Sequence, residues 1–173
     1  MGDPKKQRKK FSKPVHPWQR ERIVEEKELL KQFGLKRKQE IWKASSTLKK
    51  FLERAKILIA QRTQQSELEK RQLLDRLYKL GLVKKDSRIE DVLSLTVKNI
   101  MDRRLQTLVI KKNLAKSMLQ SRQFITHQLI IVGSRKITSP SYIVSVEEEP
   151  TIKLVREIKI DNSAKAEPKK EKE

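Results

Sequence analysis

The residues of this 173-residue chain best suited to a chemical task are its cations. Eight Lys or Arg side chains lie between Arg103 and Val146, and these 44 positions hold no Asp or Glu. The 22 acids of the chain, scattered at random, would rarely leave such a gap. Guanidinium and ammonium groups without neighbouring carboxylates bind phosphate oxygens well. We therefore expect recognition of a polyanion here, with nucleic acid as the first candidate.

Residue types that carry out catalysis or bind metals are sparse. The chain has no cysteine, its two histidines are His16 and His127, and its four glycines form neither a phosphate-binding loop nor a dinucleotide motif. Glu25, Glu26 and Glu28 belong to a highly charged segment and are interpreted as solvated carboxylates. We expect no enzyme activity, no cofactor, no metal site and no small-molecule substrate.

The charge of the whole chain agrees with a polyanionic partner. Lys and Arg number 42 against 22 Asp and Glu, for a formal net charge of +20. Repulsion at this charge opposes compaction unless an anionic partner neutralises it. The lack of cysteine, and of an apolar run near the roughly 20 residues of a membrane span, predicts a soluble, intracellular protein without a membrane partner.

Basic residues also dominate the amino terminus. Residues 1–20 carry seven Lys or Arg and three prolines without a helical or strand period, which predicts a basic arm. A floppy, solvated terminus is the alternative. Trp18 follows Pro17, and an exposed indole is unfavourable unless it packs or stacks. We favour packing of Trp18 within the protein over stacking on a base.

Apolar residues spaced three, four and seven apart predict a helical region over residues 21–102. Helices are expected from Glu21 to Gly34, over Ile41–Gln61, from Ser66 to Gly81, after Ser87 and after Thr96. Opposite its apolar stripe, the helix over Ile41–Gln61 carries five bases, and Arg62 follows as a sixth, with only Glu53 among them. Such a face often contacts only solvent, but this excess favours phosphate contact through Lys49, Lys50 and Arg54.

After Arg103 the pattern changes from helix to sheet. Ser117-x-x-Gln120 predicts the start of a short helix, Leu129–Val132 predicts a buried strand, and Gly133-Ser134 predicts a tight turn into a returning strand. A further strand is expected over Tyr142–Val146. The predicted fold class is α+β: a mostly helical amino-terminal region followed by a small domain of two helices on an antiparallel sheet.

These residues resemble the RNA-binding domain named after small-subunit ribosomal protein four. The pattern is Arg104-Leu105-x-x-Leu108, Ser117, Arg122-Gln123-x-Ile125-x-His127, Arg135-Lys136 and Pro140-Ser141-Tyr142-x-Val144. Earlier segments are similar to the archaeal and eukaryotic form of that ribosomal protein family. They are His16-Pro17-Trp18-Gln19, Leu35-Lys36-x-Lys38-x-Glu40-Ile41-Trp42 and Arg103-Arg104-Leu105-Gln106-Thr107. The similarity covers about residues 5–146.

The resemblance implies a structural protein of the small ribosomal subunit in the cytoplasm. Such a protein binds the 5′ part of 16S-type ribosomal RNA directly, nucleates assembly of the subunit body, contributes to translational accuracy and contacts ribosomal protein five. The alternative is a ribosome-assembly factor of similar sequence in a small nucleolar ribonucleoprotein particle.

The residues expected to face RNA come from the family motif and from the charged helix face. They are Arg103, Arg104, Lys112, Ser117, Gln120, Arg122, Gln123, His127, Arg135, Lys136, Ser141, Tyr142, Lys49, Lys50 and Arg54. Support of the hairpin is the alternative for His127, and packing beneath the sheet is favoured for Tyr142. Replacing Arg104 and Arg122 together by Ala is expected to weaken RNA binding and to leave the helical fold intact.

The predicted organisation is a basic arm (1–20), a helical region (21–102), an RNA-binding domain (103–160) and a disordered charged tail (161–173). Two departures from the family pattern put the hairpin geometry in question. Gln128-Leu129 replaces the usual Gly-His, and Gly133-Ser134 replaces the usual Asn-Gly. Glu147, Glu148 and Glu149 reverse the charge. They either close the domain, repel misplaced phosphate or meet a basic neighbouring protein.

Overall fold

The computed structural model describes residues 2, 9, 11–61 and 63–155. The predicted tail (161–173), the last residues of the predicted domain (156–160), Arg62 and most bases of the arm lie outside these residues. In chain order the elements are α1 (Arg20–Gln32), α2 (Lys38–Ala60), α3 (Gln64–Lys79), the 3-10 helix η1 (Ile89–Ser94), α4 (Val97–Asp102), α5 (Leu105–Lys111), α6 (Met118–Thr126), β1 (Ile130–Val132), β2 (Arg135–Lys136), the 3-10 helix η2 (Glu149–Thr151) and β3 (Ile152–Leu154). This composition confirms the predicted α+β class.

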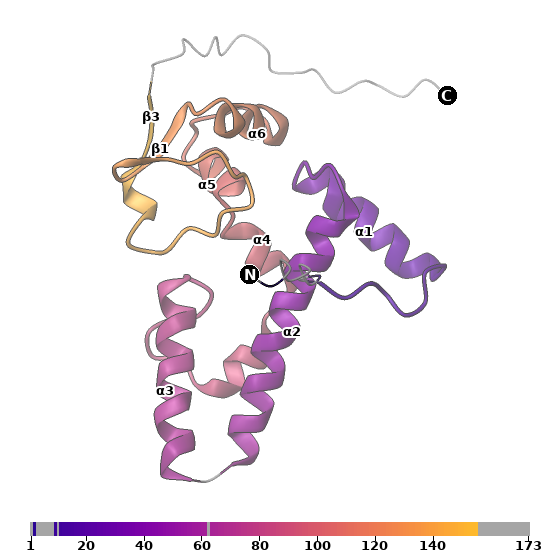
Figure 1. Cartoon of the computed structure of the whole chain (residues 1–173), viewed down its shortest axis with the longest axis vertical. Helices are drawn as coiled ribbons and strands as arrows, with labels where there is room; N and C mark the ends of the chain where they lie inside the picture. Colours follow the sequence, from indigo (N-terminus) through magenta and orange to yellow (C-terminus); the bar gives the residue numbers. More distant parts are fainter. Residues whose placement is uncertain (1, 3–8, 10, 62, 156–173) are drawn as a thin grey trace, which may run out of the picture.

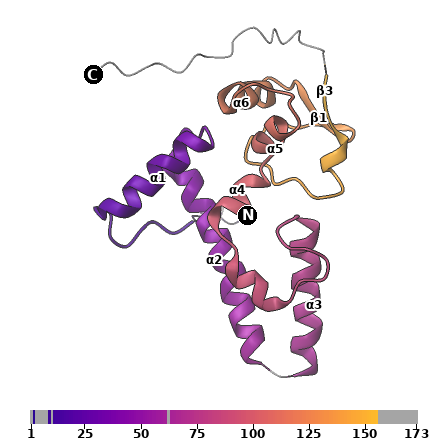
Figure 2. The same cartoon turned by 180° about the vertical axis from the view of Figure 1, so that it is seen from behind.

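Helices α2 and α3 run antiparallel and form the elongated helical part of the molecule (Figures 1 and 2). Their apolar stripes meet η1 in one buried cluster, which includes Leu48, Ala55 and Leu58 of α2 and Leu77 of α3. Leu48, Ala55 and Leu77 are thus confirmed as core, whereas the expected place of Ile59 in the stripe is wrong, because Ile59 is exposed and Leu58 is buried instead. None of the helices in the described ranges combines the length and the apolar character that a membrane crossing requires.

The predicted start of α3 is wrong by three residues. Thr63 is the N-cap, and its hydroxyl accepts a hydrogen bond from the Ser66 N–H at 3.2 Å. The Ser66 hydroxyl is buried and donates to the Thr63 and Gln61 carbonyls at 2.7 and 3.1 Å. Both residues are good caps. The turn that brings α3 back along α2 makes Thr63 the N-cap, and the local spacing of residues does not reveal this turn.

A second cluster joins α1, α2 and α4. Phe33, Ile41 and Met101 are buried together, and Met118 of α6 packs against them. The end of α1 comes so close to α6 that a Cβ at Gly34 would lie 2.6 Å from the Met118 Cβ. Gly34 also has φ +54°, so the prediction that glycine ends this helix is confirmed. Both the lack of space for a Cβ and the left-handed backbone favour glycine here.

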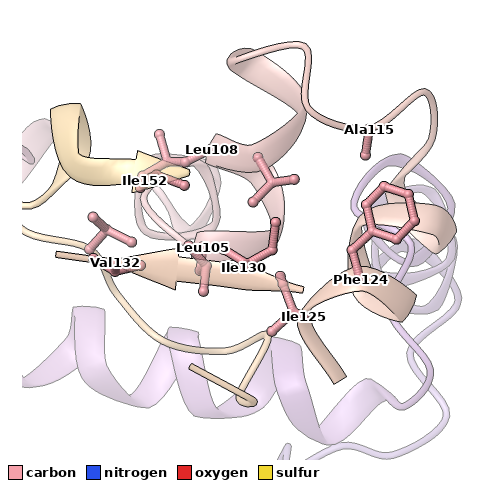
Figure 3. Close-up of a cluster of buried hydrophobic side chains, with 10 residues drawn as sticks. Leu105, Leu108, Ala115, Phe124, Ile125, Ile130, Val132 and Ile152 are labelled. Carbon is pink, nitrogen blue, oxygen red and sulfur yellow. The ribbon is translucent and has the colours of Figure 1, made fainter. Parts of the chain in front are cut away.

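The carboxyl-terminal module packs α5 and α6 on a three-stranded antiparallel sheet of order β2-β1-β3. Figure 3 shows its core, where Leu105 and Leu108 of α5 and Ile125 of α6 meet Ile130 of β1 and Ile152 of β3. The helix start at Ser117 is confirmed, because its hydroxyl accepts from the Gln120 N–H at 3.2 Å.

The strand expected over Tyr142–Val146 is wrong, and the third strand is β3. The backbone of this segment bonds to helix ends instead of to the sheet. The Tyr142 carbonyl accepts from Leu105 N–H at 2.8 Å, Val144 N–H donates to the Arg103 carbonyl at 3.1 Å, and Val146 N–H donates to the Lys79 carbonyl at 2.8 Å. The segment therefore lies along the start of α5 and ties the module to the end of α3, and the place beside β1 is taken by β3.

Both departures from the family pattern occupy left-handed backbone. Gln128 has φ +61°, in a region that glycine enters far more easily, so this position carries local strain. Gly133 has φ +61° and Ser134 does not have positive φ, which matches the type II′ preference for glycine at the first turn position. Val132 pairs with Arg135 across the turn, so the two-residue hairpin forms as predicted.

Candidate nucleic-acid interface

Half of the cations in the acid-free stretch bind carboxylates that lie outside it. Arg103 pairs with Glu149 at 2.7 Å, Lys111 with Asp102 at 3.2 Å, and Arg104 and Arg122 with Glu40 at 2.6 and 3.2 Å. The positive charge seen in the sequence is therefore partly neutralised by the fold. In the described part of the chain, ion pairs are recorded for none of the other four bases, Lys112, Lys116, Arg135 and Lys136.

Glu40 lies in the first turn of α2 and joins that helix to the module. One oxygen accepts from Arg104 Nη2 at 2.6 Å, and the other accepts from both terminal nitrogens of Arg122 at 3.2 Å. The exposed side-chain fractions are 6% for Arg104 and 17% for Arg122 and Glu40. Arg104 and Arg122, which we expected to grip phosphates, thus hold two parts of the protein together.

The electrostatics of this cluster favour the ionised carboxylate. Burial by itself would raise the pKa of Glu40, but the hydrogen bond and the charge of Arg104, together with those of Arg122, outweigh it and hold the pKa below its ordinary value. Replacing both arginines by Ala would leave Glu40 partly buried without a counter-charge. The expectation that this double substitution leaves the fold intact is therefore corrected.

Two members of the acidic triplet that follows the acid-free stretch also turn inward. Glu149 binds Arg103, and its carbonyl accepts from the Lys112 ammonium group. Glu148 accepts from the Tyr142 hydroxyl at 2.8 Å and from the Ser145 N–H at 3.1 Å. Of the three roles considered for the triplet, Glu148 and Glu149 therefore fit closure of the domain.

Glu148 and Tyr142 shift each other's ionisation. The pKa of Tyr142 is raised, first by its hydrogen bond to Glu148 and then by burial. The pKa of Glu148 is lowered, chiefly by the backbone hydrogen bond from Ser145. Tyr142 also packs against the module core, which agrees with the favoured packing role and leaves its ring poorly placed for stacking on a base.

Two more predicted residues serve the backbone. Ser117 caps α6, and the Gln120 side-chain oxygen accepts from the Lys116 N–H at 2.8 Å. By contrast, several members of the predicted set are exposed on the module. These are Gln123 and His127 on and just after α6, Arg135 and Lys136 on the edge strand β2, and Ser141 in the following loop.

Helix α2 presents a second group of cations. Lys49, Lys50 and Arg54 are all exposed, as predicted from the charged face. Lys49 lies 3.9 Å from Glu53, with both side chains largely in solvent. Lys43 is seven residues before Lys50, so the two lie on the same side of the helix.

A cleft between α2 and the module contains the Glu40 cluster and one member of the exposed group on α2, Lys43. The cleft has a volume of about 430 Å³, and its lining includes Lys43 and Thr47 of α2, Arg104, Arg122 of α6 and Ser141. Lys43 lies outside the RNA-facing set expected from the sequence, although its seven-residue spacing from Lys50 indicates that the two share a face of the helix. The role of Glu40 had no local signal, because its partners lie 64 and 82 residues away.

Helix α1 is joined to α2 by a further buried carboxylate. Glu26 accepts from Arg22 at 2.5 Å and from the Trp42 indole N–H at 2.9 Å, and Lys38 lies 3.6 Å away. The interpretation of Glu26 as solvated is therefore wrong. Packing of Trp18 is also contradicted, because this residue is 89% exposed.

Comparison with known proteins places similar sequences over both parts of the fold. Residues 103–150 match the family model described as the S4 domain. The small ribosomal subunit protein uS4 of Ignicoccus hospitalis is 49% identical over 152 residues, which cover 88% of this chain and 92% of that protein. The protein of the same name from Saccharolobus solfataricus is 48% identical over 153 residues, covering 88% of this chain and 84% of that protein.

The Glu40 cluster predicts a large effect of a small substitution. Glu40→Gln removes the charge that Arg104 and Arg122 share, so we expect the free energy of unfolding to fall by about 2 kcal/mol. Denaturant unfolding near neutral pH measures this change. Glu53→Gln is the matched control, since its exposed pair with Lys49 is expected to contribute less than about 0.5 kcal/mol. Equal losses in the two variants would contradict the structural role of Glu40.

The contribution of Glu40 also depends on pH with a defined sign. Because its folded pKa is lowered, the stabilisation is fully present above the ordinary glutamate value of about 4.3 and is lost as the pH falls through the lower folded value. The parent protein should exceed Glu40→Gln in stability at about pH 7, and the two should converge as the pH falls below the folded pKa of Glu40. Denaturant titrations across this range test the prediction, and a constant difference argues against an ionised pair.

Proposed function

Because this chain belongs to the family of small ribosomal subunit protein uS4, we propose that it is a structural protein of the small ribosomal subunit that binds the subunit RNA directly. The resemblance seen in the sequence is confirmed by these relatives. The proposal of direct RNA contact rests on the sorting of the cations. Internal carboxylates neutralise one group of bases, while another group remains exposed on both parts of the fold.

The proposed RNA surface consists of most exposed members of the predicted set and of two further exposed bases, Lys43 and Lys116. On the module they are Lys116, Gln123, His127, Arg135, Lys136 and Ser141, and on α2 they are Lys43, Lys50 and Arg54. Arg103, Arg104 and Arg122 act indirectly in this scheme, because they fix the module against α2 and against its own carboxyl end. The two cationic groups are thereby held at a constant separation.

Such a surface suits folded RNA. Lysine and arginine side chains neutralise phosphates without reading base identity, and the deep groove of an RNA duplex is closed to side chains. A rigid pair of cationic surfaces selects the spacing of phosphates on two RNA segments. Exposed Gln123 and His127 add hydrogen-bonding groups that suit 2′-hydroxyls or unpaired bases. The activity we propose is binding, with no catalytic step.

The family carries finer expectations for this chain. We propose that it binds the 5′ part of the small-subunit RNA early and nucleates assembly of the subunit body, that it lies beside ribosomal protein five, and that it contributes to translational accuracy in the cytoplasm. The support is the similarity to the uS4 relatives over 88% of the chain, which spans both the helical region and the module.

Removing the exposed cations of the hairpin tests the RNA surface. Arg135→Ala combined with Lys136→Ala should weaken binding to a transcript of the 5′ part of the small-subunit RNA. The slope of log K against log salt should become shallower by roughly 1.5, because two phosphate contacts are lost. Filter binding at several salt concentrations measures both quantities, and the stability should be unchanged.

The matched control removes the same charge elsewhere. Lys84 and Lys85 are exposed within residues 63–102, where eight bases and seven acids nearly balance. Lys84→Ala with Lys85→Ala should therefore change the salt slope far less. If the two double variants lose affinity equally, the binding is a response to net charge alone. That result would remove the hairpin from the interface.

Sedimentation separates a ribosomal protein from an assembly factor. We expect the full-length protein to remain with mature, translating small subunits after a high-salt wash, because a buried, multi-phosphate interface dissociates slowly. Quantitative immunoblotting of gradient fractions from cell extract measures its distribution. Recovery in precursor particles alone would favour the assembly-factor alternative.

A further inference from the structure

The two aromatic side chains of the amino-terminal arm lie in different environments. Phe11 packs against Trp42 of α2, with ring centroids 6.1 Å apart and planes inclined by 36°. Trp18 is 89% exposed, and among the described residues no aromatic ring is recorded against it. Phe11 therefore serves to attach the arm, whereas the fold itself makes little use of the Trp18 indole.

The backbone that carries Trp18 is held in place. The Arg22 guanidinium donates to the carbonyls of His16 and Pro17 at 3.0 and 2.9 Å, directly before Trp18. Arg22 is itself fixed by Glu26 at 2.5 Å, and Glu26 is buried beneath Trp42. The backbone from which the exposed indole projects is thus held beside the start of α1.

The surroundings of Trp18 indicate what covers it. Residues 4–20 contain seven Lys or Arg and no acid, the same composition that marks the module. Lys9, Lys13 and Arg20 are exposed in the described part of this segment. An exposed aromatic ring among cations is the arrangement by which proteins hold unpaired nucleotides, with the ring against a base and the cations on the phosphates. An apolar protein partner has no need of this excess charge.

We propose that Trp18 stacks on an unpaired base of the small-subunit RNA, with Lys13 and Arg20 beside the adjoining phosphates. This inference rests on the proposed function and adds a single-nucleotide site that is separate from the module. The Arg22 and Glu26 contacts hold the backbone before Trp18 in place before RNA arrives, so less backbone freedom is lost on binding.

The test compares Trp18→Phe with Trp18→Leu in the full-length protein, using a transcript of the 5′ part of the small-subunit RNA. Phenylalanine keeps an aromatic face, and leucine keeps only apolar surface. We expect Trp18→Phe to bind within a few-fold of the parent and Trp18→Leu to bind roughly 5- to 100-fold more weakly. Because Trp18 is exposed, both variants should unfold at the temperature of the parent.

Fluorescence gives an independent readout, because the chain has only two tryptophans. Subtracting the Trp18→Phe signal from that of the parent isolates Trp18, and stacking should quench this difference on addition of RNA. Parental affinity of Trp18→Leu, or an unquenched Trp18 signal in a parent protein that binds RNA, would overturn the inference. If Trp18→Leu bound the RNA transcript with full affinity but was lost from assembled subunits, the indole would be assigned to a protein neighbour. That result would also overturn the inference.

These outcomes are distinct from failure of the proposed function. If the parent protein shows no salt-dependent affinity for the transcript, direct RNA binding is wrong and the Trp18 site falls with it. If the parent binds with a steep salt dependence and Trp18→Leu binds equally well, the proposed function stands and only the Trp18 site is rejected.

Discussion

The arrangement of this protein depends on one partly buried carboxylate between its two parts. Glu40 of α2 binds Arg104 and Arg122, which reach it from the start of α5 and from α6. Charges withdrawn from water are unfavourable unless they are paired, so three groups with this geometry specify one placement of the module. Glu149 holds Arg103 in the same way, and Glu26 of α1 accepts from the Trp42 indole of α2. A chain of net charge +20 thus uses its few buried acids where segments join.

Local sequence patterns predicted most helices because their causes are local. Apolar spacing gave the packing faces of α2 and α3, and Gly34 and Ser117 marked a helix end and a helix start through backbone geometry and capping. The third strand was misplaced because strand pairing is a choice among distant partners. Residues 142–146 and 152–154 both suit a strand, and bonds from Tyr142 to Leu105 and from Val146 to Lys79 decide between them.

The residue types of the site were predictable from the sequence, but the role of each residue was less so. Composition and the family pattern identified the cations, but exposure and long-range ion pairs decide which of them remain free for the RNA contact that we propose. Arg104 and Arg135 look equivalent in sequence, yet one is buried against Glu40 and the other is exposed on an edge strand. Ser117 and Gln120 likewise carry a capping function that the local pattern did reveal. The partition of roles requires the tertiary structure.

The central claim, that the fold sorts its cations into internal and RNA-facing groups, is tested most directly by arginine-selective modification with a dicarbonyl reagent, read by mass spectrometry with and without the small-subunit RNA transcript. We predict that Arg104 and Arg122 resist modification in both states, whereas Arg54 and Arg135 react in the free protein and become protected in the complex. Ready modification of Arg104 and Arg122 in the free protein, or equal reactivity of Arg135 in both states, would contradict this account.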